Sequence, residues 1–112
     1  MAPGPDGSVR LGGQELFLGG ATELVEAIAA LLPTRELHSV ITPNVDQVLN
    51  LRTDGALGAA YDEASIRITD GFPLVVLGHR LGARRLERLT GADLLPLAAQ
   101  VAAERGWRIA LT

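Results

Sequence analysis

The stretch SVITPNVDQ, residues 39–47, gives the clearest indication of the fold class of this chain. A short β-branched run breaks there into polar residues beside a proline, and a helical spacing of apolar residues then begins. A second stretch, IRITDGFPL at residues 66–74, repeats this order of features. Each is typical of a strand that leads directly into a helix. The two together predict an α/β fold with a largely parallel sheet flanked by helices.

The residues before this stretch predict a hairpin and a helix. The segment VRLGGQELFLGG, residues 9–20, contains two short apolar runs separated by Gly12 and Gly13, which is typical of a tight turn between strands. Thr22 is predicted to cap the helix that follows, and Pro33 lies just beyond the end of that helix.

The residues between and after the two stretches predict three further helix starts. Asn44 is a suitable N-cap for the first helix, and Thr53 or Asp54 for the second. Pro73 suits the first turn of the third helix. The inner face of the helix after Asn44 is predicted to hold Val45, Val48 and Leu49.

The two ends of the chain set the expected domain limits. Residues 1–9 lack the charged and apolar regions of a signal peptide, so we expect a disordered leader. The segment 92–106 predicts an amphipathic helix in which Pro96 is tolerated only in the first turn, and WRIALT, residues 107–112, predicts a strand. Because no helix follows that strand, we expect residues 10–112 to be the N-terminal part of a Rossmann-like domain that is incomplete at its C-terminus.

Composition excludes several classes of protein. The chain has 112 residues, 47% hydrophobic and 21% charged, the balance of an ordinary globular protein. A net charge of −3 argues against binding nucleic acid by neutralising phosphates. There is no cysteine, which excludes disulfides and thiolate metal sites, and neither His38 nor His79 has the spacing of a metal ligand. All ten basic residues are arginine, so any phosphate must be bound by arginine, backbone amides or helix ends.

Small polar residues follow both central strands. In a parallel sheet the carboxyl ends of the strands lie along one edge, where ligands bind. Thr42 and Asn44 follow the first strand, Thr69 and Asp70 follow the second, and Thr112 ends the predicted last strand. We therefore expect these side chains to share one cleft. Asp70 is the best candidate for a general base, because it is the carboxylate at a predicted strand end.

Each of these residues also has a simple structural interpretation. Asn44 could serve only as a helix cap, Thr42 could belong to an ordinary proline loop, and Asp70 with Gly71 is a common turn pair. Residues 84–88 contain three arginines, which could be a solvated surface or could bind a diphosphate. Capping also explains Thr90 or Asp93, while Gly91 indicates a tight turn or a close backbone approach.

Three segments in order resemble one enzyme family. They are ITPNVDQVLNLRTD (41–54), ASIRITDGFPLVVLGHRLG (64–82) and ERLTGADLLPLAAQVAAERGWRIALT (87–112). They resemble the N-terminal half of the WecG/TagA/CpsF glycosyltransferases (glycosyltransferase family 26) in their Thr-Pro-Asn, Asp-Gly and Glu-Arg-x-Thr-Gly-x-Asp-Leu motifs. The segment 11–28 is also similar to the start of that family, so the resemblance covers about residues 10–112.

The resemblance implies an inverting transferase of cell-surface polysaccharide or teichoic acid synthesis. Such enzymes move N-acetylmannosamine, or a related hexosamine or uronic acid, from a UDP-sugar to N-acetylglucosamine on a polyprenyl diphosphate. It implies no metal and no cofactor, and the net charge has already argued against a nucleic acid partner. It implies a cytoplasmic enzyme in peripheral contact with the inner face of the cell membrane. Self-association of the chain is a further expectation.

The resemblance also implies roles for individual residues. Asp70 matches the aspartate of the Asp-Gly motif and would be the general base, with Gly71 beside it. The substrate-binding positions would be Thr42, Asn44, Gly71, Arg88, Thr90, Gly91 and Asp93. Arg84 and Arg85 match no motif position.

The sequence leaves two alternatives open. The chain could be a non-catalytic α/β binding remnant of this fold, or an unrelated nucleotide-binding α/β enzyme. The family's later glycines and second half do not occur within these residues, so we expect that this piece alone could be inactive.

Overall fold

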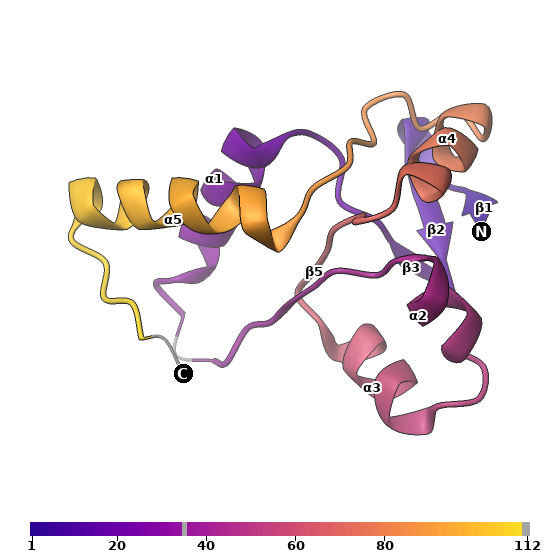
Figure 1. Ribbon diagram of the computed structural model, residues 1–112, viewed down its shortest axis with the longest axis horizontal. Coiled ribbons are helices and arrows are strands. Elements are labelled where there is room, and N and C mark those ends of the chain that lie inside the picture. Colours follow the sequence, from indigo (N-terminus) through magenta and orange to yellow (C-terminus); the bar gives the residue numbers. More distant parts are fainter. Residues whose placement is uncertain (35, 111–112) are drawn as a thin grey trace.

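Two small sheets organise the part of the chain that the computed structural model describes, residues 1–34 and 36–110 (Figure 1). The first is antiparallel and holds β1 (Ala2–Pro3), β2 (Val9–Leu11) and β3 (Gln14–Glu15). The second is parallel and holds β4 (Val40–Ile41) and β5 (Ile66–Arg67). The helices are the 3₁₀ turn η1 (Pro5–Gly7) and α1 (Ala21–Leu31), α2 (Val45–Asn50), α3 (Gly55–Glu63), α4 (Phe72–Arg80) and α5 (Gly91–Arg105).

The antiparallel sheet confirms the predicted hairpin. β2 pairs with β3 in the register Arg10 to Glu15 and Leu11 to Gln14. Gly12 and Gly13 form the turn with φ of +62° and +83°, and only glycine adopts such angles readily at both positions of a tight hairpin turn. Residues 1–9, which we expected to be a disordered leader, here contain η1 and a strand, β1, that pairs with β2.

The parallel sheet is much smaller than the sequence predicts. Val40 pairs with Ile66 and Ile41 with Arg67, and a single parallel bridge joins Thr69 to Arg88 on the other side of β5. The fold is therefore mixed α/β, and the expected largely parallel, Rossmann-like sheet is not confirmed. Residues 107–110 form no strand, although their sequence alternates like one. A strand needs a neighbour for its backbone groups, and alternation of side chains does not supply one. Thr112 lies outside the described residues.

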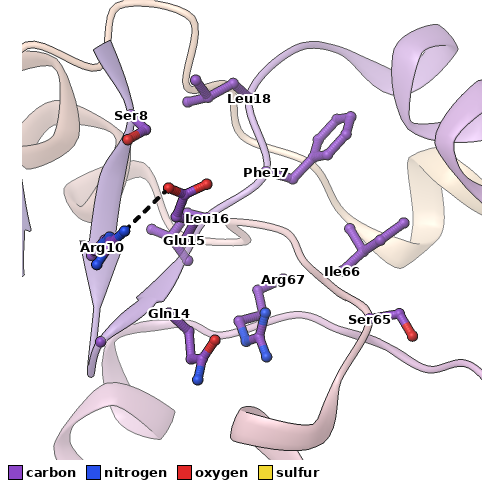
Figure 2. A pocket seen from close by; sticks show the side chains of 11 residues that line it. Ser8, Arg10, Gln14, Glu15, Leu16, Phe17, Leu18, Ser65, Ile66 and Arg67 are labelled. Atoms are coloured by element: carbon purple, nitrogen blue, oxygen red, sulfur yellow. Dashed lines mark ion pairs between the residues drawn. The ribbon is translucent and has the colours of Figure 1, made fainter. Parts of the chain in front are cut away.

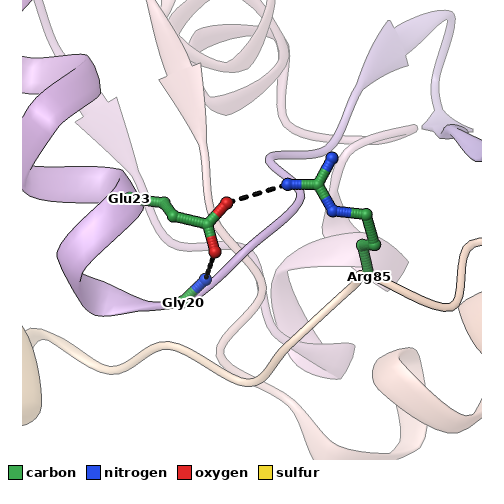
Figure 3. Close-up of polar contacts among 3 residues, drawn as sticks. All are labelled: Gly20, Glu23 and Arg85. Carbon is green, nitrogen blue, oxygen red and sulfur yellow. Dashed lines mark hydrogen bonds and ion pairs between the residues drawn. The ribbon is translucent and has the colours of Figure 1, made fainter.

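Helix starts follow the predicted caps with one exception. The Asn44 and Asp54 side chains accept hydrogen bonds from the backbone N–H groups of Gln47 and Leu57, each at 3.0 Å. Pro73 lies in the first turn of α4 as predicted. The cap of α1 was predicted wrongly. The helix begins after Gly20, because the carboxylate of Glu23 accepts the Gly20 N–H at 3.3 Å and leaves Thr22 exposed within the first turn (Figure 3).

Pro96 lies in the second turn of α5 rather than the first. The helix begins at Gly91, one residue earlier than predicted, because Thr90 caps it. A proline at this position cannot donate to the Ala92 carbonyl. Ala92 and Pro96 are both exposed, so that carbonyl faces solvent and the helix tolerates the proline.

The apolar residues form two clusters on opposite faces of the parallel strands. One contains Ile68 with Leu24 and Leu89, and α1 and α5 lie side by side over it (Figure 1). The other joins the hairpin to Tyr61 and Leu86, with Ile41 and Val48 packed against it. Of the predicted inner face of α2, only Val48 packs inward. Val45 is 40% exposed and Leu49 is 70% exposed, so that part of the prediction was wrong.

Candidate functional site

Three junctions, each leading into a helix, meet at the carboxyl end of β5. The Asp70 N–H donates to the Pro43 carbonyl at 3.2 Å, which continues the parallel pairing beyond β4 and β5. On the other side, the Leu89 N–H donates to the Thr69 carbonyl at 2.7 Å, next to the bridge with Arg88. The segments that lead into α2, α4 and α5 therefore run parallel and side by side, with β5 in the middle.

Gly71 allows the starts of α2 and α4 to approach closely. It is buried, and a Cβ atom built on it would lie 3.9 Å from the Asn44 Cα and 3.6 Å from the Leu74 Cγ. Asn44 and Gly71 thus come together as predicted, with Thr42 and Asp70 on the same two junctions. Thr42, Asn44 and Asp70 are each half-buried, an exposure that suits contact with a ligand.

The third junction contributes its backbone more than its side chains. The Thr90 hydroxyl accepts the Asp93 N–H at 3.0 Å, so Thr90 has the capping role that the sequence allowed. Arg88 lies beside Thr69 through the backbone bridge, and its side chain is exposed. Gly91 and Asp93 are exposed in the first turn of α5. These residues flank the edge, and the binding roles expected of them remain predictions.

The two other arginines of this region have different surroundings. Arg85 forms an ion pair with Glu23 at 2.8 Å, the same carboxylate that caps α1 (Figure 3). Its carbonyl also accepts the Gly19 N–H, so the loop before α5 is tied to the start of α1. Arg84 is exposed. Arg85 therefore joins the loop before α5 to the start of α1.

Sequence reasoning missed one polar group at this edge, the side chain of Gln47. Within the described residues, two buried side-chain oxygens have no hydrogen-bond partner, Gln47 Oε1 and Thr69 Oγ1. Thr69 directly precedes Asp70, and the Gln47 N–H is bound to the Asn44 side chain. The spacing Asn44-x-x-Gln47 was the available signal, because it matches a capping box. In a capping box the glutamine side chain would accept a hydrogen bond from the Asn44 backbone N–H, and Gln47 Oε1 forms no such bond here.

An open cavity lies elsewhere on the molecule. It has a volume of about 610 Å³ and is lined by residues of the hairpin and of the segment 65–67, including Gln14, Ser65 and Arg67 (Figure 2). None of the predicted site residues lines it. The buried Arg67 has a structural explanation, because its guanidinium donates to the Tyr61 and Asp62 carbonyls at the end of α3 and lies 5.2 Å from the centre of the Tyr61 ring. We therefore place the candidate site at the strand ends.

The described part of the chain contains neither a cluster of metal-binding side chains nor a membrane-spanning helix. No group of three or more His, Asp or Glu side chains among residues 1–34 and 36–110 could hold a metal ion. No helix in the same ranges is both long and apolar enough to cross a bilayer.

Comparison with known proteins gives one match. Residues 9–112 match the family model described as "Glycosyl transferase WecG/TagA/CpsF family". The three junctions all lie within the matched region. No curated protein and no solved structure matches this chain.

Proposed function

Because this chain belongs to the WecG/TagA/CpsF family of glycosyl transferases, we propose that it carries the catalytic base of an inverting sugar transfer. The donor is a UDP-sugar with N-acetylmannosamine or a related hexosamine or uronic acid. The acceptor is N-acetylglucosamine on a polyprenyl diphosphate, at the inner face of the cell membrane. The observation that supports the proposal is the meeting of Asp70 with the Asn44 and Arg88 junctions at one edge.

The proposed reaction is a single displacement. The Asp70 carboxylate takes the proton from the acceptor hydroxyl as its oxygen attacks the anomeric carbon of the donor. The new carbon–oxygen bond forms on the face opposite the diphosphate, so the anomeric configuration inverts. The bond from the anomeric carbon to the diphosphate breaks, and UDP leaves with that electron pair.

The other residues bind and orient the two substrates. Asn44 and Thr42 line the acceptor side of Asp70, and Gly71 lets the substrate approach the backbone because it has no side chain. The Arg88 guanidinium can bind two diphosphate oxygens at once, and it meets the charge that grows as UDP leaves. Thr90, Gly91 and Asp93 shape the start of α5 beside it.

The test is a transfer assay with Asp70→Asn. We would measure transfer from UDP-N-acetylmannosamine to a short-chain lipid diphosphate N-acetylglucosamine, using this chain and the longest reading frame that contains it. Loss of a general base lowers rates by about 10²–10⁴-fold. We expect a fall in kcat of that size in Asp70→Asn, with an unchanged melting temperature.

Asp62→Asn is the matched control, because Asp62 is exposed on α3, away from the strand ends. It should retain full activity. Near-normal turnover in Asp70→Asn would remove Asp70 from the mechanism. A wild-type protein that binds both substrates without any transfer would identify a binding module instead.

A further inference from the structure

Two buried oxygens at the candidate site have no hydrogen-bond partner. They are Gln47 Oε1 and Thr69 Oγ1. Every other buried side-chain nitrogen or oxygen in the described ranges has a hydrogen-bond partner. Thr69 is fully buried. A buried polar atom that lacks a partner destabilises a fold, and native proteins contain few of them. Thr69 lies on the junction before Asp70, and Gln47 lies in the first turn of α2 directly after the neighbouring junction, so their position needs an explanation.

Thr69 and helix α2 lie on the same face of the parallel strands. Ile66 and Ile68 pack in the cluster under α1 and α5, so the alternation of the strand turns Thr69 to the opposite face. Val48 of α2 packs against the cluster on that opposite face, which places α2 there as well. Gln47 directly precedes Val48, and its backbone N–H is bound to Asn44.

Ordinary structural roles do not account for these two groups. Gln47 has capping-box spacing after Asn44, yet its side-chain oxygen does not accept the backbone N–H that such a box provides. At a fully buried strand position, valine has the shape of threonine without a hydroxyl that needs a partner. Polar groups that weaken a fold in this way are typical of functional sites.

We propose that Gln47 and Thr69 together bind one hydroxyl group of the sugar substrate and so position it against Asp70. This inference rests on the proposed function. A hydroxyl donates one hydrogen bond and accepts others, so it can donate to Gln47 Oε1 while it accepts from the Thr69 hydroxyl.

Binding requires a small movement of α2, because both oxygens are closed to solvent in this structure. α2 is the element suited to move. It has six residues, none of them fully buried, and Val45 and Leu49 are exposed. When α2 moves outward, the Gln47 side chain becomes accessible from the edge where Asp70 and Gly71 lie. α2 then closes over the bound substrate, and this closure is part of substrate recognition.

The experiment compares stability with kinetics in the longest reading frame that contains this chain. Thr69→Val keeps the shape and removes the hydroxyl, Thr69→Ser keeps the hydroxyl, and Gln47→Met removes the amide. Thr22→Val on the exposed start of α1 is the matched control. We would measure the melting temperature, kcat, and KM for UDP-N-acetylmannosamine and for the lipid-linked N-acetylglucosamine separately.

We expect Thr69→Val to leave the melting temperature unchanged or raise it by about 4 °C, because it removes an unpaired buried group. The same variant should raise KM for one of the two substrates by about tenfold, which corresponds to one lost hydrogen bond. Thr69→Ser should restore KM to within about threefold of wild type. A threefold change corresponds to a smaller free energy than one neutral hydrogen bond contributes. Because one hydroxyl joins both residues, Thr69→Val combined with Gln47→Met should raise KM little more than either change alone.

Two results would overturn the inference while wild-type transfer stands. One is a Thr69→Val variant with unchanged KM and kcat. The other is a Thr69→Val variant whose melting temperature falls by several degrees, because the hydroxyl would then have a structural partner in the free protein. A wild-type protein with no transfer, and no rise in melting temperature with either substrate, would overturn the proposed function itself and this inference with it.

Discussion

Tyr61 is the residue whose chemistry the fold changes most clearly. Its hydroxyl is buried and donates to the Leu11 carbonyl, which ties α3 to the hairpin. Burial raises the pKa of Tyr61 to about 12, from an ordinary value of 10.0. The raised pKa means that the folded state holds the phenol proton more tightly than the unfolded chain does.

This pKa predicts a loss of stability in alkaline solution. Stability from the raised pKa is fully present below the unfolded pKa near 10 and is lost as the pH rises toward about 12. We expect the free energy of unfolding to be about 1 kcal/mol lower at pH 11 than at pH 9. The chain has one tyrosine, no cysteine and no lysine, so few other groups titrate in this range. Urea unfolding at both pH values measures the difference.

Tyr61→Phe is the control for that experiment. It should lower stability at pH 7 by about 1–2 kcal/mol, because the Leu11 carbonyl loses its buried donor. The difference between pH 9 and pH 11 should then disappear. An equal alkaline loss in both proteins would show that another group is responsible.

At the scale of single elements, caps and turns were predictable and the position of Pro96 was not. Asn44, Asp54 and the pair Gly12–Gly13 act through neighbours within four residues, so their local sequence is sufficient. The start of α1 depended on Glu23, whose carboxylate also meets Arg85 from a distant part of the chain. A choice between Gly20 and Thr22 as the cap therefore needed the tertiary structure.

The second-turn position of Pro96 predicts that α5 can be strengthened. A proline inside a helix is about 3 kcal/mol less favourable than alanine, although proline also restricts the unfolded chain. We expect Pro96→Ala to raise the free energy of unfolding by about 1–2 kcal/mol in urea. Pro73→Ala is the matched control. Pro73 lies in the first turn of α4, where the missing N–H has no partner in the helix, so its loss should give no gain. A destabilised Pro96→Ala variant would show that α5 depends on this proline for its packing against α1.

At the scale of the whole molecule, β5 connects the parts. Ile66 packs against one apolar cluster, Arg67 lies over the Tyr61 ring of the other, and Asp70 follows the carboxyl end of the strand. Figure 1 shows the parallel strands running between the α1 and α5 pair and the group formed by the hairpin, α2 and α4. The same strand thus holds the fold together and positions the candidate site.

Ile68 is the residue that tests this central role. Ile68 lies two residues before Asp70 and is fully buried between Leu24 of α1 and Leu89. We expect Ile68→Ala to lower the free energy of unfolding by about 3 kcal/mol, because it leaves a cavity at the point where three segments meet. Leu37→Ala is the control, since Leu37 is 99% exposed and should change stability by less than about 0.5 kcal/mol. Equal effects of the two changes in urea would contradict the packing described here.

The sequence by itself determined the features that depend on neighbouring residues or on motif order. These are the hairpin turn, the caps of α2 and α3, the two strands that lead into helices, and membership of the glycosyl transferase family. It also placed Thr42, Asn44, Asp70 and Gly71 on neighbouring junctions, because the ends of parallel strands must lie together.

Other features depend on distant parts of the chain and became visible only in the folded structure. Within the predicted strand 107–112, the described residues 107–110 form no strand, because a strand depends on a neighbour that its own sequence cannot specify. The partnerless oxygens of Gln47 and Thr69 are equally invisible in the sequence. Burial and hydrogen bonding depend on the atoms that surround a group, and only the fold brings those atoms together.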